Sequence, residues 1–454
     1  MNKPDALTLV IFGASGDLTR RKLMPALYLL YKAGRLPRRF AVLGMARTSY
    51  DDDRFRTSIR EGLLSFVRPD EVDEKAIHAF LSCLHYLSAD PSKPEAYAEL
   101  RIRLEEIDRT IDNPHNYLYY LATPPLLYGV IPRHLKAEGL NRDGDGFRRI
   151  VVEKPFGYDL SSALELNRIY LDAFREEQIY RIDHFLGKET VQNILALRFS
   201  NSVFEPLWNR NYIDYVEITA VENMGIGTRG GFYDGVGTLR DMVQNHLAQL
   251  LAVTAMEPPA AFDASGFRNE VVKVYQSLTP LTGEDIRHSV VRGQYMASEG
   301  RKGYREEEQV PTMSRTETYL AMRLELNNWR WGGVPFYIRT GKQMPTKVSE
   351  IVIHFKPAPY SLFRCEGGTC PVPNRLVIRI QPNEGIVLRL GMKKPGEGFE
   401  VLPMDMDFSY AELGRLPTED AYARLIEDCI AGDPTLFIRS DAVESGWRFF
   451  DPIL

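Results

Sequence analysis

Residues 7–18 read LTLVIFGASGDL, an apolar run of strand length that leads directly into a turn with two glycines and then into a helix. Glycine in such a turn lets the backbone approach a pyrophosphate, and the helix presents free N–H groups and the positive end of its dipole. The spacing GxxGxL is shorter than GxGxxG, and a strand–helix turn without a ligand would use the same glycines. Because the turn closes the first strand of an expected parallel sheet, we predict a dinucleotide-binding turn. Its residues are Gly13, Ala14, Ser15, Gly16, Asp17 and Leu18.

Strand and helix patterns alternate through the N-terminal third of the chain. Buried strands separated by crossover helices are typical of a doubly wound, Rossmann-like parallel sheet of the α/β class. In the first helical segment, Pro25 predicts either a kink or a helix that restarts with this residue in its first turn. The expected strands are Leu7–Phe12, Phe40–Gly44, Leu84–Leu87, Tyr117–Ala122 and Ile150–Val152.

After about residue 180 the pattern changes to successive alternating runs, which predict an α+β domain with a mainly antiparallel sheet covered by helices. We place the domain boundary near residues 175–180, which gives a first domain of 1–178 and a larger second domain of 179–454. The expected strands are Tyr212–Val221, Thr318–Leu326, Ile351–Phe355, Leu376–Ile380 and Ile386–Leu390. The expected covering helices are Glu189–Phe199, Leu239–Val253 and Thr418–Ile430.

The composition limits the kind of protein. The 454 residues suffice for two or three domains, and 56 basic against 61 acidic residues give a formal charge of −5. This balance argues against a protein that wraps nucleic acid or lies on an anionic membrane. No apolar run approaches the ~18 residues of a membrane span, and the first residues lead into no secretory segment. We therefore expect a cytoplasmic protein with neither a nucleic-acid nor a membrane partner.

Four cysteines, too few for a disulfide scaffold, occur in the chain. Cys365 and Cys370 could pair or hold a metal, but neither has a nearby histidine or further cysteine to complete a set of four ligands. We therefore expect reduced thiols and no metal site. The other two cysteines are Cys83 and Cys429.

The end of the second expected strand bears on the choice of cofactor. A site selective for NAD usually places an acid here for the ribose 2′-hydroxyl, whereas this strand runs into Arg47 and Thr48. An arginine suits a 2′-phosphate through charge-assisted hydrogen bonds, although Arg47 could also be a plain surface charge. We predict NADP, with NAD as a weaker alternative. Asp90, at the end of the third strand, should also lie near the cofactor.

Two further segments carry candidate substrate residues. Glu153-Lys154-Pro155 follows the fifth strand, where open α/β sheets bind ligands, and Pro155 is a candidate for a cis peptide bond. A Glu–Lys pair with a purely structural role at the rim of the sheet would have the same sequence. In RIDHFLGKE at 181–189, Asp183 and His184 would point to opposite sides if the segment is extended. Lys188 at a helix start would hold an anion such as a sugar phosphate, unless the charges form only salt bridges.

A second histidine lies on a helix further along the chain. His246 falls within its apolar stripe, where a histidine is usually a satisfied core residue. A partly desolvated histidine with a carboxylate on its second nitrogen would instead be a general base near neutral pH. Asp241 lies about 140° away around an α-helix and cannot easily be that carboxylate, so the partner must come from elsewhere. The stripe consists of Leu239, Met242, Val243, His246, Leu247 and Leu250.

Taken together, these segments resemble the glucose-6-phosphate dehydrogenase family. The resemblance covers most of residues 7 to about 355, and the DHFLGKE and RDMVQNH segments are specific. It implies oxidation of β-D-glucose 6-phosphate to 6-phospho-D-glucono-1,5-lactone with reduction of NADP. The matches, in the expected order, are GASGDLTRRKLMPALYLLY at 13–31, LATPP at 121–125, EKPFG at 153–157, RIDHFLGKE at 181–189, RGGFYDGVGTLRDMVQNHL at 229–247 and VPFYIRTGK at 334–342.

The resemblance also implies a role for each matching residue. His246 would be the general base that removes the C1 hydroxyl proton, and Asp183 would orient it. His184 and Lys188 would bind the phosphate, and Lys154 would bridge substrate and cofactor. The residues that grip sugar hydroxyls or phosphate would be Glu222, Asp241, Lys342 and Lys347. Those implied for the dinucleotide are Gly13, Gly16, Lys22, Arg47 and Thr48.

The chain also departs from the family pattern. Phe185 stands where many members carry tyrosine, so one hydroxyl contact to phosphate would be lost. The region after residue 355 matches weakly, and a second, structural nucleotide site is unsupported. By resemblance we expect a homodimer, or a dimer of dimers, formed through the face of the large sheet.

Two alternative functions remain open at this point. The glucose–fructose and inositol dehydrogenase-like family combines a dinucleotide fold with an EKP motif and a helical histidine, but usually acts on unphosphorylated sugars. Lys188 after a glycine, with His184 four residues earlier, argues for a phosphorylated substrate. A non-enzymatic sensor of NADPH and sugar phosphate should lack either the base or the orienting acid, and both Asp183 and His246 are present.

Overall fold

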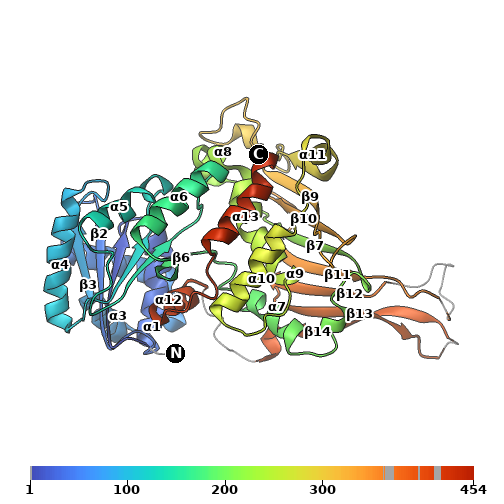
Figure 1. Ribbon diagram of the computed structural model, residues 1–454, viewed down its shortest axis with the longest axis horizontal. Coiled ribbons are helices and arrows are strands. Elements are labelled where there is room, and N and C mark those ends of the chain that lie inside the picture. The colour runs from blue at the N-terminus through green and yellow to red at the C-terminus, as the bar shows by residue number, and fades with distance from the viewer. Residues whose placement is uncertain (1–2, 361, 363–372, 397–398, 414–420) are drawn as a thin grey trace. The chain divides into compact units, whose positions relative to one another are not determined.

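The computed structural model describes residues 3–360, 362, 373–396, 399–413 and 421–454 (Figure 1). The chain forms two compact units: the first gathers Met1–Gly187, Ala261–Arg268 and Glu419–Glu444, and the second Lys188–Ala260, Asn269–Thr418 and Ser445–Leu454. The change from the first to the second unit thus comes at Gly187/Lys188 rather than near residue 178. A single cut also misses the return of the chain, which brings residues 419–444 into the first unit.

The first unit is built on a six-stranded parallel sheet in the order β3-β2-β1-β4-β5-β6. Every residue of β1 is buried, because crossover helices cover both faces, and this explains why the strand is a continuous apolar run. The doubly wound prediction is therefore confirmed. The strands are β1 (Ala6–Phe12), β2 (Arg39–Ala46), β3 (Leu84–Ser88), β4 (Tyr117–Leu121), β5 (Arg148–Val152) and β6 (Ile179–Arg181).

The helices of this unit begin with a π-helical turn, η1 (Thr19–Leu23), after which α1 (Met24–Lys32) starts with Pro25 in its first turn. Proline is tolerated there because the first N–H groups of a helix have no intrahelical acceptor, so the predicted restart is confirmed. The remaining helices are α2 (Asp52–Phe66), α3 (Glu74–Ser82), α4 (Glu95–Ile111), α5 (Val130–Ala137), α6 (Leu160–Ala173) and α12 (Ala421–Ala431).

The second unit contains an eight-stranded sheet in the order β14-β13-β12-β11-β7-β10-β9-β8. Its neighbouring strands are antiparallel except β7 and β10, which run parallel, so the expected mainly antiparallel sheet is confirmed with one parallel pair. The strands are β7 (Ile213–Val221), β8 (Val290–Gly293), β9 (Tyr319–Glu325), β10 (Pro335–Gly341), β11 (Val348–Phe355), β12 (Arg375–Gln381), β13 (Gly385–Lys393) and β14 (Val401–Ser409).

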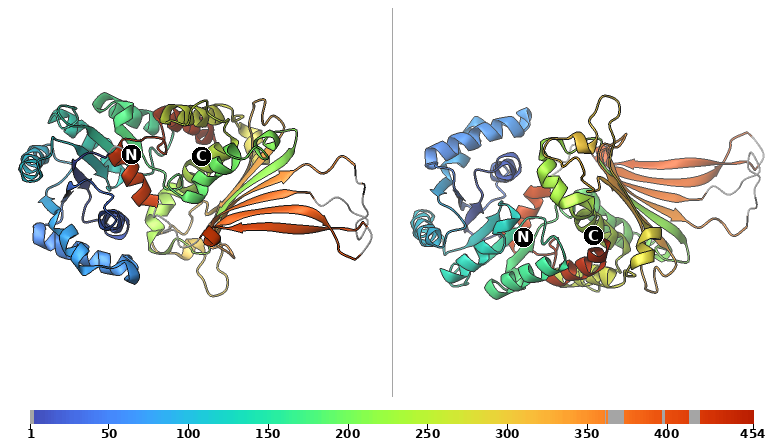
Figure 2. Two further views of the ribbon diagram at one scale, coloured as in Figure 1. Left: turned by 90° about the horizontal axis from the view of Figure 1, so that it is seen from below. Right: turned by 90° about the horizontal axis from the view of Figure 1, so that it is seen from above.

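Helices gather on one side of this sheet (Figure 2). α7 (Glu189–Phe199) contacts β12, and η7 (Leu239–Leu247) contacts β7 and β10. The covered face of β9 carries the buried side chains Leu320, Met322 and Leu324, which alternate with more exposed ones as predicted. The other helices are α8 (Gly230–Thr238), α9 (Ala248–Ala255) and α11 (Gly283–Ser289), with α10 (Ala264–Gln276) and α13 (Ser440–Phe450) shared between the units.

Two expectations about helices need correction. The segment expected as one α-helix over Leu239–Val253 consists of the π-helix η7 followed by α9. The described part of the last expected helix begins at Ala421, and Thr418 lies outside the described residues, as do Cys365 and Cys370. Within the described part of the chain, each helix is too short or too polar to cross a membrane.

Candidate active site

The glycine turn after β1 is shaped by close backbone packing. Gly13 has φ +85°, and a Cβ there would lie 2.2 Å from the carbonyl oxygen of Ala122 at the end of β4. Its N–H donates to Met45 O at 2.8 Å, and its carbonyl accepts from Gly16 N–H at 2.9 Å. Only glycine fits this position, and the turn leads directly into the first helix, as a dinucleotide-binding turn requires.

The end of β2 meets this turn through two hydroxyl groups. Ser15 Oγ and Thr48 Oγ1 lie 2.8 Å apart. Arg47 is exposed beside them, and its charge helps to lower the pKa of Asp90 after the backbone N–H of Ser92, which is the larger cause. The structure therefore gathers Ser15, Arg47, Thr48 and Asp90 at the carboxyl ends of neighbouring parallel strands. A phosphate at this place would find one guanidinium and two hydroxyls.

Glu153 and Lys154 follow β5 and differ in their surroundings. Glu153 is buried, accepts a hydrogen bond from Tyr120 Oη at 2.6 Å, and burial raises its pKa. Lys154 is half-buried, and the peptide bond that joins it to Pro155 is cis, as anticipated. The two side chains thus lie in different surroundings. The phenol of Tyr120 holds the carboxyl of Glu153 inside the unit, while Lys154 lies at the end of the strand.

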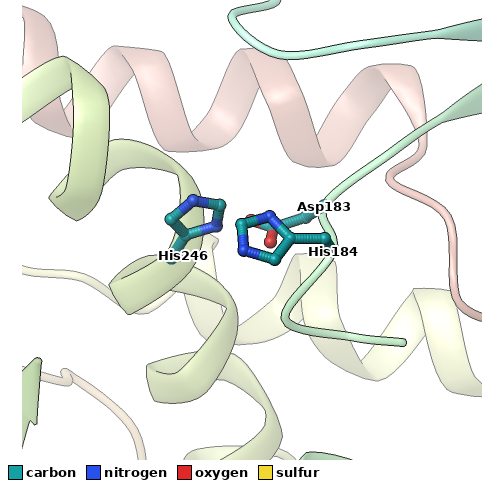
Figure 3. Close-up of side chains that lie close together, drawn as sticks. All are labelled: Asp183, His184 and His246. Carbon is teal, nitrogen blue, oxygen red and sulfur yellow. The ribbon is translucent and has the colours of Figure 1, made fainter. Parts of the chain in front are cut away.

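Asp183 and His184 enter a turn rather than an extended segment (Figure 3). Asp183 is 1% exposed, and its Oδ1 accepts the N–H of Phe185 at 2.9 Å. The His184 ring lies parallel to that of Tyr422, with the ring centroids 6.3 Å apart. Phe185 is buried, so its ring packs inside the unit. The turn fixes the acid while leaving the imidazole half-buried on an aromatic face.

The start of α7 carries the next candidate. Lys188 is the N-cap residue of α7, as predicted, and its Nζ donates to Gln381 Oε1 at 2.6 Å. Gln381 ends β12, and Glu384 follows in the next turn with a pKa that burial raises and Lys188 lowers in part. The amino group is therefore oriented by a neutral amide at a helix N-terminus, which suits an anion.

A buried lysine holds two carboxylates together in the second unit. Lys342 Nζ lies 2.6 Å from Glu222 Oε2 and 3.6 Å from Asp241 Oδ2. The ring of Tyr233 faces the same ammonium group, with its centroid 5.3 Å away. The structure thus brings together three of the four residues expected to grip sugar hydroxyls or phosphate. Lys347, the fourth, is exposed in the connection from β10 to β11.

His246 lies on η7, where it is 1% exposed; Figure 3 shows this histidine on its helix and Asp183 and His184 on the segment after β6. The estimate of 140° between Asp241 and His246 assumed an α-helix. In a π-helix the hydrogen bonds close between residues five apart, so the angle between these two side chains is smaller than in an α-helix. The estimate of 140° therefore does not apply, since hydrophobic periodicity does not reveal a π-helical register. That the carboxylate partner of His246 comes from elsewhere in the chain stays a prediction.

Sequence reasoning missed three side chains that contact candidate residues. Tyr422 faces His184, Gln381 accepts from Lys188, and Tyr233 faces Lys342. Tyr422 lies on α12, in the region whose pattern is weakest, and Gln381 ends an ordinary alternating strand. Of the three, only Tyr233 lies in a segment that matches the family, at 229–247. Its place in that segment is the one feature of the sequence that could have indicated it.

The residues in each unit divide by chemistry. The first unit offers a glycine turn with hydroxyls and a guanidinium, which fits a dinucleotide phosphate. The second offers a buried imidazole and a lysine between carboxylates, which fit proton transfer and polyol recognition. Asp183, His184 and His246 are of residue types that also bind metals.

Two family models match the chain, one over its N-terminal part and one over its C-terminal part. A family model described as the NAD binding domain of glucose-6-phosphate dehydrogenase matches residues 10–193, and one described as its C-terminal domain matches residues 195–454. The chain is 53% identical to glucose-6-phosphate 1-dehydrogenase from Aggregatibacter actinomycetemcomitans over 456 residues, which cover 100% of this chain and 91% of that protein.

Other similar proteins agree with these matches. A protein of the same name from Treponema pallidum is 48% identical over 98% of this chain and 88% of its own length. A solved structure of glucose-6-phosphate dehydrogenase in complex with its substrate glucose-6-phosphate has a TM-score of 0.92 and 35% identity, and the match covers 100% of this chain and 92% of that one. The chain therefore belongs to the glucose-6-phosphate dehydrogenase family.

Proposed function

We propose that this protein oxidises β-D-glucose 6-phosphate to 6-phospho-D-glucono-1,5-lactone and transfers the hydride to NADP, the first step of the oxidative pentose phosphate pathway. The observation that carries the proposal is full-length identity of 53% to a protein named glucose-6-phosphate 1-dehydrogenase. The chemistry of the described side chains supports it, since a buried imidazole, a buried carboxylate and several cations are the groups that this reaction needs.

In this proposal His246 is the general base. Its imidazole takes the proton of the C1 hydroxyl while the C1–H bond breaks, and the electron pair of that bond leaves as hydride. NADP, when bound, accepts the hydride on its nicotinamide. Asp183 is the acid that orients the imidazole and stabilises its protonated form. Because both side chains are 1% exposed, water competes little for the proton.

The positive groups would hold the sugar phosphate. His184 and Lys188 bind the phosphate, and Lys154 lies between substrate and cofactor. The proposed role of Lys342 is supported by its surroundings, because two carboxylates hold its ammonium group at 2.6 and 3.6 Å. Those carboxylates accept from sugar hydroxyls. The full set of proposed substrate residues is Lys154, His184, Lys188, Glu222, Asp241, Lys342 and Lys347.

The preference for NADP is part of the proposal. Arg47 and the hydroxyls of Ser15 and Thr48 are the donors for a 2′-phosphate, and their closeness to the glycine turn supports this assignment. NAD, which lacks that phosphate, would be the weaker substrate. The proposed cofactor residues are Gly13, Ala14, Ser15, Gly16, Asp17, Leu18, Lys22, Arg47, Thr48, Asp90 and Lys154.

The proposal extends to the assembly and its compartment. Helices cover one face of the eight-stranded sheet (Figure 2). Strand alternation and register place Tyr215, Glu217 and His354 on the opposite face, a set that suits contact with a second copy of the chain. We infer a homodimer, or a dimer of dimers, through this face. A cytoplasmic location fits the small number of cysteines.

Steady-state turnover tests the proposed function. The purified protein should reduce NADP many times per active site with glucose 6-phosphate, because the phosphate-binding cations are part of the site. Glucose without the phosphate should give a kcat/KM lower by at least about a hundredfold, since charge-assisted hydrogen bonds of about 1.5–3 kcal/mol each are lost. Equal rates on the two sugars would favour a dehydrogenase of unphosphorylated sugars, and a single stoichiometric turnover would favour a sensor.

A further inference from the structure

Glu317, just before β9, holds the start of the helix that carries His246. Its Oε1 accepts the N–H of Leu239, the first residue of η7, at 3.0 Å. Its backbone carbonyl accepts the N–H and the hydroxyl of Thr238 at 3.2 and 2.9 Å. The first N–H groups of a helix have no acceptor within the helix. A carboxylate at this end supplies an acceptor and also interacts favourably with the helix dipole.

Gly237 makes room for this carboxylate. It has φ +73°, and a Cβ at this position would lie 2.9 Å from Oε1 of Glu317. The backbone there is not helical, so α8 ends and η7 begins around the glutamate. The break between the two helices is therefore shaped to admit the Glu317 side chain.

The same residue also connects to the buried lysine. Glu317 O and Thr238 Oγ1 both lie within hydrogen-bond distance of Tyr233 Oη, at 3.4 and 2.6 Å. The ring of Tyr233 faces Lys342 Nζ. The next residue, Thr318, accepts the backbone N–H of Lys342 at 2.9 Å. Residue 317 therefore contacts the start of η7 and the hydroxyl of Tyr233, and residue 318 contacts the backbone of Lys342.

The need for such a support follows from the helix type. π-Helical segments are rare, and they occur mostly as short stretches that often lie at functional sites. Here the π-helical register, with its hydrogen bonds between residues five apart, sets the directions in which Asp241 and His246 leave the helix. If the N-terminal turn of η7 loses its acceptor, both side chains change direction together.

We infer that Glu317 is a positioning residue for the reaction: its carboxylate holds the start of η7 and thereby fixes the direction of His246 and Asp241. This inference rests on the proposed function, because it assigns Glu317 to the same site. The carboxylate acts through the first turn of η7 and does not itself contact the substrate, while the contact with Tyr233 belongs to the backbone carbonyl of residue 317.

The test compares four variants under the same assay. Glu317→Ala removes the acceptor, and Glu317→Gln keeps an oxygen at the same place. Glu325→Ala is the matched control, since Glu325 lies at the end of β9 and its carboxylate pairs with Arg323 on the exposed side of the strand. Gly237→Ala moves the carboxylate without changing it. Each variant is assayed for kcat, for both KM values, and for its thermal midpoint.

We expect Glu317→Ala to lower kcat by about tenfold or more and to raise KM for glucose 6-phosphate several-fold, because small displacements of catalytic groups are costly. KM for NADP should stay within about twofold of the unchanged protein, since Arg47 and the glycine turn are untouched. Glu317→Gln should restore at least half of kcat, and Gly237→Ala should reproduce the pattern of Glu317→Ala. Glu325→Ala should match the unchanged protein.

A purely structural role would give a different result. The thermal midpoint of Glu317→Ala would then fall while kcat and KM per folded molecule stayed unchanged, and this outcome would overturn the inference. An equal loss in Glu317→Gln and Glu317→Ala would also overturn it, because the acceptor oxygen would then be irrelevant. Failure of the proposed function is distinguishable, since the unchanged protein would then show no turnover of glucose 6-phosphate at all.

Discussion

At the residue scale, the proposed preference for NADP rests on Arg47. Its guanidinium is exposed next to the hydroxyl pair of Ser15 and Thr48, and it lies close enough to Asp90 to lower the pKa of that carboxyl. Arg47→Ala should lower kcat/KM for NADP by about 10- to 100-fold, the equivalent of losing one or two charge-assisted hydrogen bonds. The value for NAD should change by less than about twofold, because NAD lacks the 2′-phosphate.

Initial rates with both cofactors measure this effect. Arg54→Ala is the matched control, since Arg54 is an exposed arginine on α2 in the same unit. An unchanged ratio of NADP to NAD efficiency in Arg47→Ala would remove Arg47 from the phosphate site. The sequence indicated this residue because it follows the second strand, whose end contacts the ribose in typical dinucleotide-binding folds. The contact between Ser15 and Thr48, in contrast, depends on how two distant loops fold.

At the element scale, the end of α12 shows how one glycine can be required for two reasons. Gly432 has φ +81°, and a Cβ there would lie 2.4 Å from a guanidinium nitrogen of Arg149. That guanidinium donates to the carbonyls of Cys429 and Ile430 at 2.7 Å each and lies 3.7 Å from the ring centroid of Phe147. Two of the last carbonyls of α12 are therefore satisfied by the Arg149 side chain, which a Cβ at residue 432 would displace.

Gly432→Ala should therefore destabilise the protein more than Gly139→Ala. Gly139 has a similar φ of +73°, but a Cβ there would meet nothing within 4 Å. We expect about 1 kcal/mol for Gly139→Ala from backbone strain alone, and about 2–3 kcal/mol for Gly432→Ala because the hydrogen bonds of Arg149 are also disturbed. Thermal and urea midpoints measure the difference. Equal losses of stability in the two variants would show that the Arg149 side chain moves aside without cost.

Strands and helices were predictable from the sequence where one hydrophobic pattern runs through the whole element. Apolar runs gave five of the six parallel strands, and strict alternation gave β9 and β12, since burial on two faces or one face sets those patterns. The three-residue strand β6 was not predicted, because it is too short to show a pattern. The π-helix η7 escaped prediction because its side chains still follow an apolar stripe. β14 also escaped, since most of its residues are exposed at the edge of the sheet and no burial imposes a pattern on them.

At the scale of the whole molecule, the two units could be anticipated, but their composition could not. The change from alternating strands and helices to successive strands indicated a boundary, and the structure moves it to Gly187/Lys188. Residues 419–444 join the first unit through contacts such as that of Arg149 with Cys429. Such long-range packing leaves no local signal, so Tyr422 could not be placed beside His184 from its spacing.

The central claim is that this protein moves a hydride from C1 of glucose 6-phosphate to NADP with His246 as the base. The most direct measurement uses glucose 6-phosphate deuterated at C1 and follows deuterium into the reduced cofactor by mass spectrometry. We predict one deuterium per NADPH, and a rate lower by about a thousandfold or more in His246→Ala but unchanged in His288→Ala, an exposed histidine on α11. NADPH without deuterium, or full activity in His246→Ala, would contradict the account.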